Sequence, residues 1–171
     1  QIDLKTAPGV FSHRRLDTGA RCLIETMEVM AGDRILDLGC GSGGVGIAAA
    51  LRAPETHVTM VDVNPRALAC AEWGLKKNEV RQFETCLNAY VEVEPSGSYD
   101  LVLANPPYYS DQQIAKIMFE GGFKALRPAG MMLLVTKQPE WYHEQYGDKV
   151  AEYQSWSWRS YTIIAVRQFD D

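Results

Sequence analysis

Short apolar runs alternate with segments of helical periodicity along the whole chain, and this alternation limits the possible folds more than any other feature. The expected strands are 34–38, 57–63, 82–87, 99–104 and 131–136, followed by 150–156 and 161–167. The expected helices are 17–30, 45–52, 65–78, 111–125 and a short helix after Pro139. Strands separated by helices predict an α/β fold, Rossmann-like and doubly wound, with a mostly parallel seven-stranded sheet. Because no helix separates the last two strands, we expect them to form an antiparallel hairpin at one edge.

Length and composition favour one packed domain. A chain of 171 residues, 46% of them hydrophobic, can fill one core, so we expect a single domain over residues 1–171. No run is long and apolar enough to span a membrane, and no charged-then-apolar leader is found, which predicts a cytoplasmic protein. The formal charge of −5 argues against a diffuse basic surface that coats nucleic acid, although a local basic patch remains compatible with it.

The cysteines do not follow the spacing of a metal site. They form no CxxC pair and have no histidine at ligand spacing, so we expect reduced core thiols and no metal. The four cysteines are Cys22, Cys40, Cys70 and Cys86.

A glycine-rich turn follows the first expected strand. Gly39, Gly41 and Gly44 satisfy G-x-G-x-x-G, and the helix expected from Val45 would present free backbone N–H groups to a nucleotide-like ligand. The preceding Asp37 would repel the pyrophosphate of NAD. It would instead pair with the α-ammonium group of S-adenosylmethionine (SAM), so the loop favours SAM over NAD. The alternative is a tight turn that binds no ligand.

Asp62 closes the second expected strand, at about the spacing of a carboxylate that binds ribose hydroxyl groups. This feature fits NAD and SAM equally. The alternative is that Asp62 caps the helix that begins at Pro65, and one side chain can do both.

The run Asn105-Pro106-Pro107-Tyr108 directly follows the expected strand 99–104. An amino group on a purine or a carboxamide is a poor nucleophile, because its lone pair is delocalised. An Asn side-chain oxygen and a backbone carbonyl of the Pro-Pro turn can hold such an amine and help its nitrogen to become pyramidal, while Tyr108 stacks on the planar substrate. The run therefore predicts methyl transfer to nitrogen. The alternative is a surface turn, since Asn-Pro often begins one.

With these residues in place, the chain resembles the class I SAM-dependent methyltransferases of the amino-methylating group, and most of all the small-domain RNA guanine-N2 methyltransferases that modify ribosomal RNA. The resemblance covers nearly the whole chain and depends on the runs 8–12, 16–19, 36–43, 61–64 and 105–108. It implies one SAM-dependent methyltransferase domain. The implied catalytic residues are Asn105, Pro106, Pro107 and Tyr108. The implied cofactor-binding residues are Asp37, Gly39, Cys40, Gly41, Asp62, Val63, Asn88, Ala89 and Asn105.

Two features depart from this group. Leu87-Asn88-Ala89 stands where such enzymes usually have an acidic residue, so Asn88 is expected to hydrogen-bond adenine through a neutral group. The ribosomal enzymes also often carry a second, duplicated domain and an aromatic-histidine pair after the prolines, whereas the pair here is Tyr108-Tyr109.

The expected partner is RNA, either ribosomal RNA or a ribosomal particle, bound by a monomer or weak homodimer. Arg14 and Arg15 are candidate phosphate contacts, with a solvated turn as the alternative reading. Methylation of adenine N6 or of a protein glutamine amide remains open, because the same loop suits any planar NH2 group. A nicotinamide oxidoreductase and a SAM-binding module without turnover are the other classes.

Overall fold

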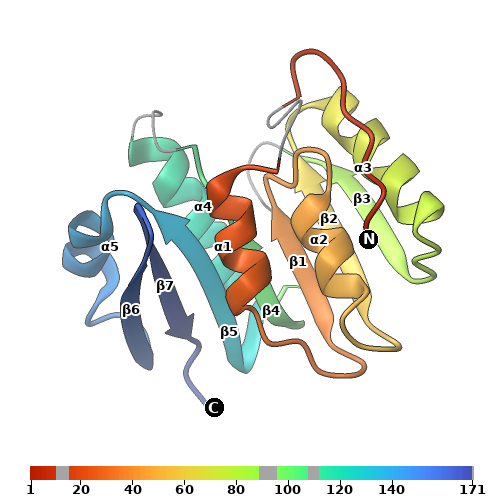
Figure 1. Cartoon of the computed structure of the whole chain (residues 1–171). Helices are drawn as coiled ribbons and strands as arrows, with labels where there is room; N and C mark the ends of the chain where they lie inside the picture. The colour runs from red at the N-terminus through yellow and green to blue at the C-terminus, as the bar shows by residue number, and fades with distance from the viewer. Residues whose placement is uncertain (11–15, 89–95, 108–111, 171) are drawn as a thin grey trace.

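A computed structural model describes residues 1–10, 16–88, 96–107 and 112–170, and within these ranges it contains one seven-stranded sheet (Figure 1). The order of the strands across the sheet is β3-β2-β1-β4-β5-β7-β6. The strands are β1 (Arg34–Leu38), β2 (His57–Asp62), β3 (Phe83–Leu87), β4 (Tyr99–Ala104), β5 (Leu126–Thr136), β6 (Glu152–Trp158) and β7 (Tyr161–Arg167).

The direction of the strands matches the fold class expected from the alternation. The pairs β1–β2, β2–β3, β1–β4 and β4–β5 are parallel, whereas β7 is antiparallel to both β5 and β6. The predicted mostly parallel sheet with an antiparallel hairpin at its edge is therefore confirmed. The chain moves outward from β1 on one side and from β4 on the other, so the topological switch point lies between these two strands. Ligands of open α/β sheets bind outside the carboxyl ends of the strands at such a point.

Helices cover both faces of the sheet (Figure 1). One face packs against α1 (Thr18–Thr26), α2 (Gly44–Ala50) and α3 (Pro65–Lys77), and the other against α4 (Gln112–Ala125) and α5 (Pro139–Tyr146). Each face of the sheet has its own hydrophobic core: the first lies under α1, α2 and α3, and the second under α4 and α5. Adjacent residues of β1 contribute to different cores, Ile35 to the first and Leu36 to the second. Burial on both sides explains why β1, β2, β4 and β5 are mostly apolar, whereas β3, at the edge of the sheet, is largely exposed. No helix in the described ranges is long and apolar enough to cross a bilayer.

The first helix is shorter than its apolar spacing predicts, and the expectation that it extends to Met30 is wrong. Met27 leaves the helix with φ −65° and ψ 137°, and the side chain of Met30 is 69% exposed. The Thr26 hydroxyl donates to the Cys22 carbonyl at 2.7 Å, and the Asp33 carboxylate holds the turn that follows by accepting from Met30 N at 2.8 Å. These polar contacts end the helix although helical spacing continues in the sequence.

Strand boundaries also differ from expectation, by one residue in β2 and β3 and by more in β6 and β5. β6 spans Glu152–Trp158 instead of 150–156. It extends to Trp158 because Trp158 pairs with Tyr161 and leaves a two-residue hairpin connection. Arg159 lies in this connection with φ 54°, a conformation usually adopted by Asn or Gly, so the sequence predicted the hairpin but contained no turn signal to mark where its strands end.

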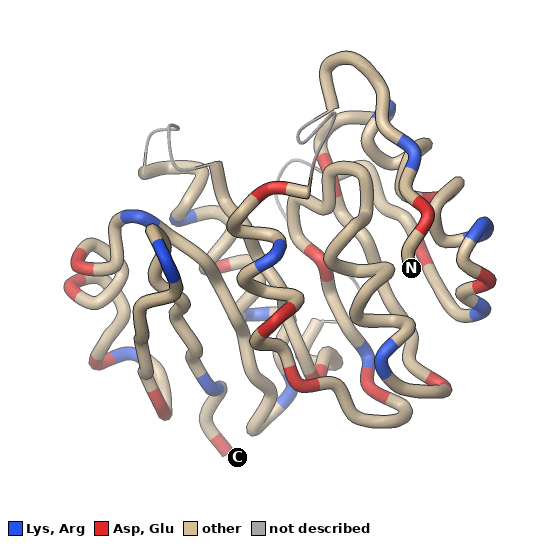
Figure 2. Tube along the Cα trace, in the orientation of Figure 1, with Lys and Arg blue, Asp and Glu red and all other residues tan. Residues whose placement is uncertain are grey.

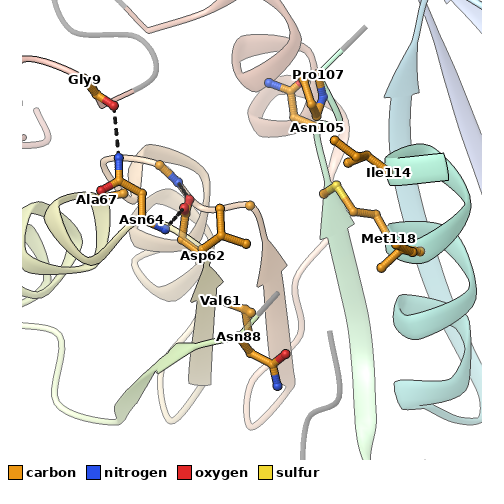
Figure 3. Close-up of a pocket in the computed structure, with 14 residues that line it drawn as sticks. Gly9, Val61, Asp62, Asn64, Ala67, Asn88, Asn105, Pro107, Ile114 and Met118 are labelled. Carbon is orange, nitrogen blue, oxygen red and sulfur yellow. Dashed lines mark hydrogen bonds between the residues drawn. The ribbon is translucent and has the colours of Figure 1, made fainter. Parts of the chain in front are cut away.

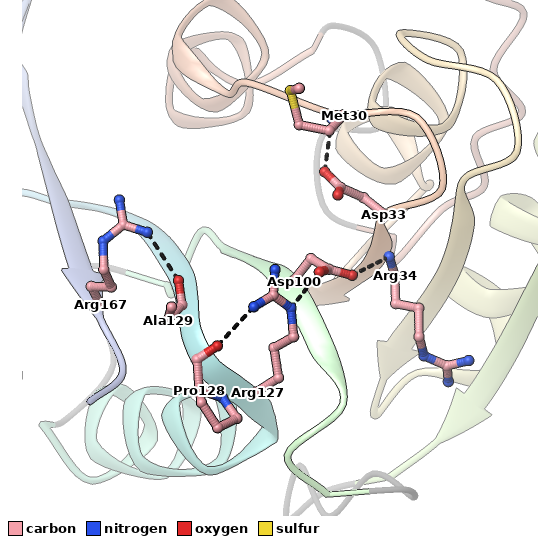
Figure 4. Close-up of polar contacts among 8 residues, drawn as sticks. All are labelled: Met30, Asp33, Arg34, Asp100, Arg127, Pro128, Ala129 and Arg167. Atoms are coloured by element: carbon pink, nitrogen blue, oxygen red, sulfur yellow. Dashed lines mark hydrogen bonds and ion pairs between the residues drawn. The ribbon is translucent and has the colours of Figure 1, made fainter. Parts of the chain in front are cut away.

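β5 begins at Leu126 instead of residue 131, with an irregularity in its pairing to β4. Ala129 adopts φ 59° there, and Arg167 Nη1 donates to its carbonyl at 2.9 Å. Arg127 pairs with Asp100 at 2.5 Å, and Asp100 also accepts from Arg34 N at 2.8 Å (Figure 4). These contacts hold the early part of β5 at the amino edge of the sheet, away from the switch point.

Candidate functional site

A cavity of about 410 Å³ lies at the carboxyl ends of β1, β2 and β4 (Figure 3). A second, much smaller cavity of about 30 Å³ lies beside it, and the two share Gly39, Gly41 and Asn105. The larger cavity is lined by Gly9, Gly39, Gly41, Val61, Asp62, Val63, Asn64, Ala67, Asn88, Asn105, Pro107, Ile114, Ile117 and Met118. The glycine loop and the Asn-Pro-Pro run, about 66 residues apart in sequence, therefore border one site.

The glycine loop is held against the end of β2. Gly39 N and Cys40 N both donate to the Val61 carbonyl, at 2.8 and 3.0 Å. Gly39 and Gly41 have φ values of 66° and 54°, in the left-handed region that favours glycine. The loop thus forms a backbone-lined floor without side chains at the point where both cavities meet.

Asp62 is fixed in orientation by backbone donors. Its Oδ2 accepts from Gly41 N and its Oδ1 from Asn64 N, both at 2.8 Å. Each carboxylate oxygen retains capacity for another donor, so ligand hydroxyl groups in the larger cavity can still bind it. The cap of α3 is Asn64 and not Asp62, because Asn64 Oδ1 accepts from Arg66 N at 3.0 Å. Asn64 also donates to the Gly9 carbonyl at 3.0 Å (Figure 3).

Asp37 lies in the smaller cavity, away from the larger one. It is 3% exposed, and its Oδ2 accepts from Gly46 N at 2.8 Å in the first turn of α2. The pKa of the Asp37 carboxyl is raised to about 7, mainly by burial; the Gly46 N–H bond opposes this shift and the nearby Asp62 carboxylate adds to it. A cation placed in this cavity would favour the ionised form of Asp37.

Asn105 lies where the two cavities meet, at the end of β4. Its Nδ2 donates to Asp17 Oδ2 at 2.6 Å, and Asp17 is the N-cap residue of α1. Pro106 is buried and lines neither cavity, whereas Pro107 lines the larger one. The side chain of Asn105 is therefore the polar group of this run that borders both cavities. Tyr108, the expected stacking residue, lies outside the described residues.

The other expected cofactor residues are divided between the cavities. Cys40 is buried in the smaller cavity, and burial with the nearby carboxylates Asp37 and Asp62 raises the pKa of its thiol, so it is a poor nucleophile. Val63, 66% exposed, and Asn88 line the larger cavity. Ala89 lies outside the described residues, as do Arg14 and Arg15.

Two walls of the larger cavity were not expected from the sequence. Gly9 contributes backbone from the N-terminal segment, and Ile114, Ile117 and Met118 contribute side chains from α4. Figure 3 shows Ile114 and Met118 extending from α4 toward the cavity. The apolar periodicity of α4 indicated one buried face, but it could not indicate that part of this face borders a ligand site.

The composition of the site suits an organic ligand with polar and apolar parts. Carboxylate and amide groups alternate with apolar walls, as in many small-molecule sites. No group of three or more His, Cys, Asp or Glu side chains suited to hold a metal is found in residues 1–10, 16–88, 96–107 and 112–170.

Comparison with known proteins extends this description. A family model described as the methyltransferase small domain matches residues 1–164. Ribosomal RNA small subunit methyltransferase C of Escherichia coli is 29% identical over 175 residues, covering 98% of this chain and 50% of that protein. Ribosomal RNA large subunit methyltransferase G of Streptomyces avermitilis is 36% identical over 140 residues, covering 79% of this chain and 37% of that protein. The chain thus spans half or less of the length of these relatives.

The fold is also shared with a solved structure, that of the T. thermophilus 16S rRNA N2 G1207 methyltransferase in complex with AdoMet and guanosine. The TM-score is 0.84 at 21% identity, over 98% of this chain and 47% of that one. At this identity the likeness concerns the fold, whereas the family model matches almost the entire sequence. The chain therefore belongs to the methyltransferase small domain family.

Proposed function

We propose that this chain is a SAM-dependent N-methyltransferase that methylates the exocyclic N2 amine of a guanine in ribosomal RNA. The observation that carries the proposal is the location of Asn105, which borders both the cavity that contains Asp62 and the cavity that contains Asp37. A side chain there can meet a substrate amine and a cofactor at once. The names of both relatives support methyl transfer to ribosomal RNA, and the T. thermophilus protein that shares the fold is a 16S rRNA N2 G1207 methyltransferase.

The residues present fit SAM. Asp62 would bind the ribose hydroxyl groups, and Asn88 the adenine edge, between the apolar walls of the larger cavity. Asp37 would pair with the α-ammonium group, and Gly39 and Gly41 allow the ligand to approach the backbone closely. When bound, SAM supplies an electrophilic methyl group on a sulfonium centre.

The Asn-Pro-Pro run would hold the amine for transfer. Asn105 Oδ1 and a backbone carbonyl of the Pro-Pro turn, of which Pro107 lines the larger cavity, would be the two acceptors for the two amine hydrogens, and accepting both would favour a pyramidal nitrogen with an exposed lone pair. Hydrogen bonds to these acceptors strengthen as the nitrogen becomes positive, so they stabilise the transition state more than the ground state. The methylated nitrogen would then release one proton to water, and no covalent bond to the protein would be needed.

The proposed substrate and cellular location are based on the names of the relatives. This chain spans at most half of the length of each relative. We infer that residues 1–171 form one methyltransferase domain of a cytoplasmic protein that acts on ribosomal RNA or a ribosomal particle, as a monomer or weak homodimer without a metal. Figure 2 shows acidic and basic residues interspersed along the described trace. With a net charge of −5, RNA must be held by a few local basic groups.

Calorimetry and methyl transfer test this proposal in two steps. SAM should bind and NAD should not. Tritiated methyl groups should then be transferred to undermethylated ribosomal RNA, offered both naked and in assembled subunits, with the product located by mass mapping as N2-methylguanine. Transfer to adenine N6 or to a glutamine amide would replace the guanine assignment, and SAM binding without transfer to any of these substrates would indicate a non-catalytic module.

A further inference from the structure

Asp17 connects the start of α1 to the Asn-Pro-Pro run, across 88 positions of sequence. Its Oδ2 accepts from Gly19 N at 3.1 Å and from Ala20 N at 3.3 Å, as an N-cap residue does. The same oxygen accepts from Asn105 Nδ2 at 2.6 Å, the shortest of the three hydrogen bonds. One carboxylate therefore both starts a helix and binds the side chain proposed to meet the substrate.

This contact determines which end of the Asn105 amide is the donor. An Asn side chain has an acceptor oxygen and a donor nitrogen of nearly equal size, so shape alone does not select its orientation. A carboxylate has only acceptors, and it repels the amide oxygen. With Nδ2 held by Asp17, the remaining polar atom of the amide is Oδ1, an acceptor. A substrate amine requires an acceptor at this place.

Gly19 limits the position of the same amide from the other side. A Cβ atom on residue 19 would stand 2.5 Å from Asn105 Oδ1 and 3.1 Å from Asp17 Oδ2. Contacts below 3.0 Å force one of the atoms to move, and the Asn105 amide is the end of a side chain, so it would be displaced. The absence of a side chain at residue 19 thus provides the space that Oδ1 occupies.

We propose that Asp17 and Gly19 are positioning residues for methyl transfer: they orient the Asn105 amide so that its oxygen, and not its nitrogen, is presented to the substrate amine. This inference rests on the proposed function, because it gives Asn105 the role of amine acceptor. Asp17 and Gly19 act through Asn105 and need not touch substrate or cofactor. A misplacement of about 1 Å at a reacting group can cost about 100-fold in rate.

Asp17→Ser separates orientation from helix capping. Serine is as good an N-cap as aspartate, so α1 should start normally. Its hydroxyl is shorter and both donates and accepts, so it no longer selects one orientation of the Asn105 amide. We expect kcat to fall about tenfold or more, while the Kd for SAM stays within about threefold and the melting temperature changes by no more than about 4 °C. The matched control is Asp33→Ser, which removes another backbone-binding carboxylate, at the opposite edge of the sheet, and should leave kcat unchanged.

Gly19→Ala should displace the Asn105 amide without removing a polar group. Alanine is the better helix former, so the melting temperature should not fall by more than about 4 °C, whereas kcat should again fall about tenfold or more. Thr18→Ala, a small change in the same turn, is the control. In an Asn105→Ala background, adding either Asp17→Ser or Gly19→Ala should change kcat by less than about twofold, because the residue that they orient is already absent.

Nuclear magnetic resonance provides a readout that does not need a substrate. The side-chain amide signal of Asn105, assigned by its loss in Asn105→Ala, should be shifted downfield and protected from exchange by the hydrogen bond to Asp17. Asp17→Ser should move it toward the position of an exposed amide, and Asp33→Ser should not. If the signal is unchanged in Asp17→Ser, or if both variants retain kcat within about twofold of wild type, the positioning role is disproved. A wild-type chain that binds SAM but transfers no methyl group would disprove the proposed function, whereas the amide signal would still test the contact.

Discussion

The pKa of the Asp37 carboxyl is raised from the usual 3.8 to about 7, mainly because the group is buried; the Gly46 N–H bond opposes this shift and the nearby Asp62 carboxylate adds to it. Between these two values the folded chain without ligand binds a proton that the unfolded chain releases. The free energy of unfolding is therefore highest at low pH, where the carboxyl is protonated in both states. It falls as the pH rises between the two pKa values, because the unfolded chain then releases the proton more readily. The ionisation of Asp37 is thus coupled to folding and to the binding of a cation in the smaller cavity.

The stability of the ligand-free chain should fall between about pH 4 and pH 7 because of Asp37, after which the effect levels off. Asp37→Asn removes the titrating group but retains an oxygen for the Gly46 N–H, so its free energy of unfolding should lack this decrease. Urea unfolding of both proteins at several pH values measures the difference. A difference that does not change with pH would mean that Asp37 is ionised throughout this range.

Asp62→Ala should weaken SAM binding about ten- to a hundred-fold, because a hydrogen bond to a charged acceptor contributes about 1.5–3 kcal/mol. The variant also loses two backbone contacts, to Gly41 N and Asn64 N, so circular dichroism and melting must accompany the calorimetry. Asp33→Ala, which removes a carboxylate at the other edge of the sheet, should not change the SAM affinity. A folded Asp62→Ala chain with normal affinity would remove Asp62 from the site.

Asn105→Ala should reduce methyl transfer about 100-fold or more, the scale of one lost transition-state hydrogen bond of about 3 kcal/mol, while SAM and RNA still bind. The reason is that the acceptor acts mainly as the substrate nitrogen gains charge. Single-turnover transfer, compared with equilibrium binding of both ligands, separates the two effects. Normal turnover in this variant would show that the Asn-Pro-Pro run is only a turn.

At the scale of elements, α4 connects the core to the site, since Phe119 is buried in the second core while Met118 borders the larger cavity. Gly122 lets this helix approach the sheet closely. A Cβ there would stand 2.9 Å from Leu38 Cδ1 and 3.1 Å from both Met132 Cε and Val102 Cγ1. The position of the helix, and with it one cavity wall, thus depends on a residue without a side chain.

Gly122→Ala should lower the free energy of unfolding by about 1–2 kcal/mol, because overpacking of the core exceeds the gain of about 1 kcal/mol in helix propensity. Chemical denaturation measures this change. Lys116→Ala, at an exposed position of the same helix, should be nearly neutral. A stabilised Gly122→Ala chain would mean that α4 can move away from the sheet at little cost.

At the scale of the whole molecule, an acidic chain must use local contacts to hold a polyanion. The net charge is −5, and Lys and Arg are interspersed with Asp and Glu along the described trace (Figure 2). The basic pair Arg14 and Arg15, next to the segment that leads into α1, is the first candidate for phosphate contact.

Neutralising Arg14 and Arg15 together should weaken RNA binding and reduce the slope of log affinity against log salt by about 0.7–0.9 for each lost phosphate contact. The affinity for SAM should hardly change. The matched control neutralises Lys77 and Arg81 near the end of α3, where we expect solvated charges and an unchanged slope. An unchanged slope for the Arg14 and Arg15 variant would move the RNA contact elsewhere, and a chain that methylates only a protein amide would have no such slope.

Local patterning was sufficient for the number and direction of the strands. Parallel strands are buried on both faces and end in turns with special backbone needs, so apolar runs followed by glycine, aspartate or proline are visible in one dimension. The glycine loop and Asn105 line one cavity at the same edge of the sheet, because parallel strands share their carboxyl ends.

Contacts between distant segments could be decided only by the tertiary structure. Apolar spacing reports which side of a segment is buried, but not what buries it, so it extended α1 past Thr26 and could not place Gly9 or α4 in the cavity wall. The hydrogen bond from Asn105 to Asp17 spans 88 positions and has no local signature. It exists because the packing of α1 on the sheet brings a helix cap to the end of β4, and only folding creates that proximity.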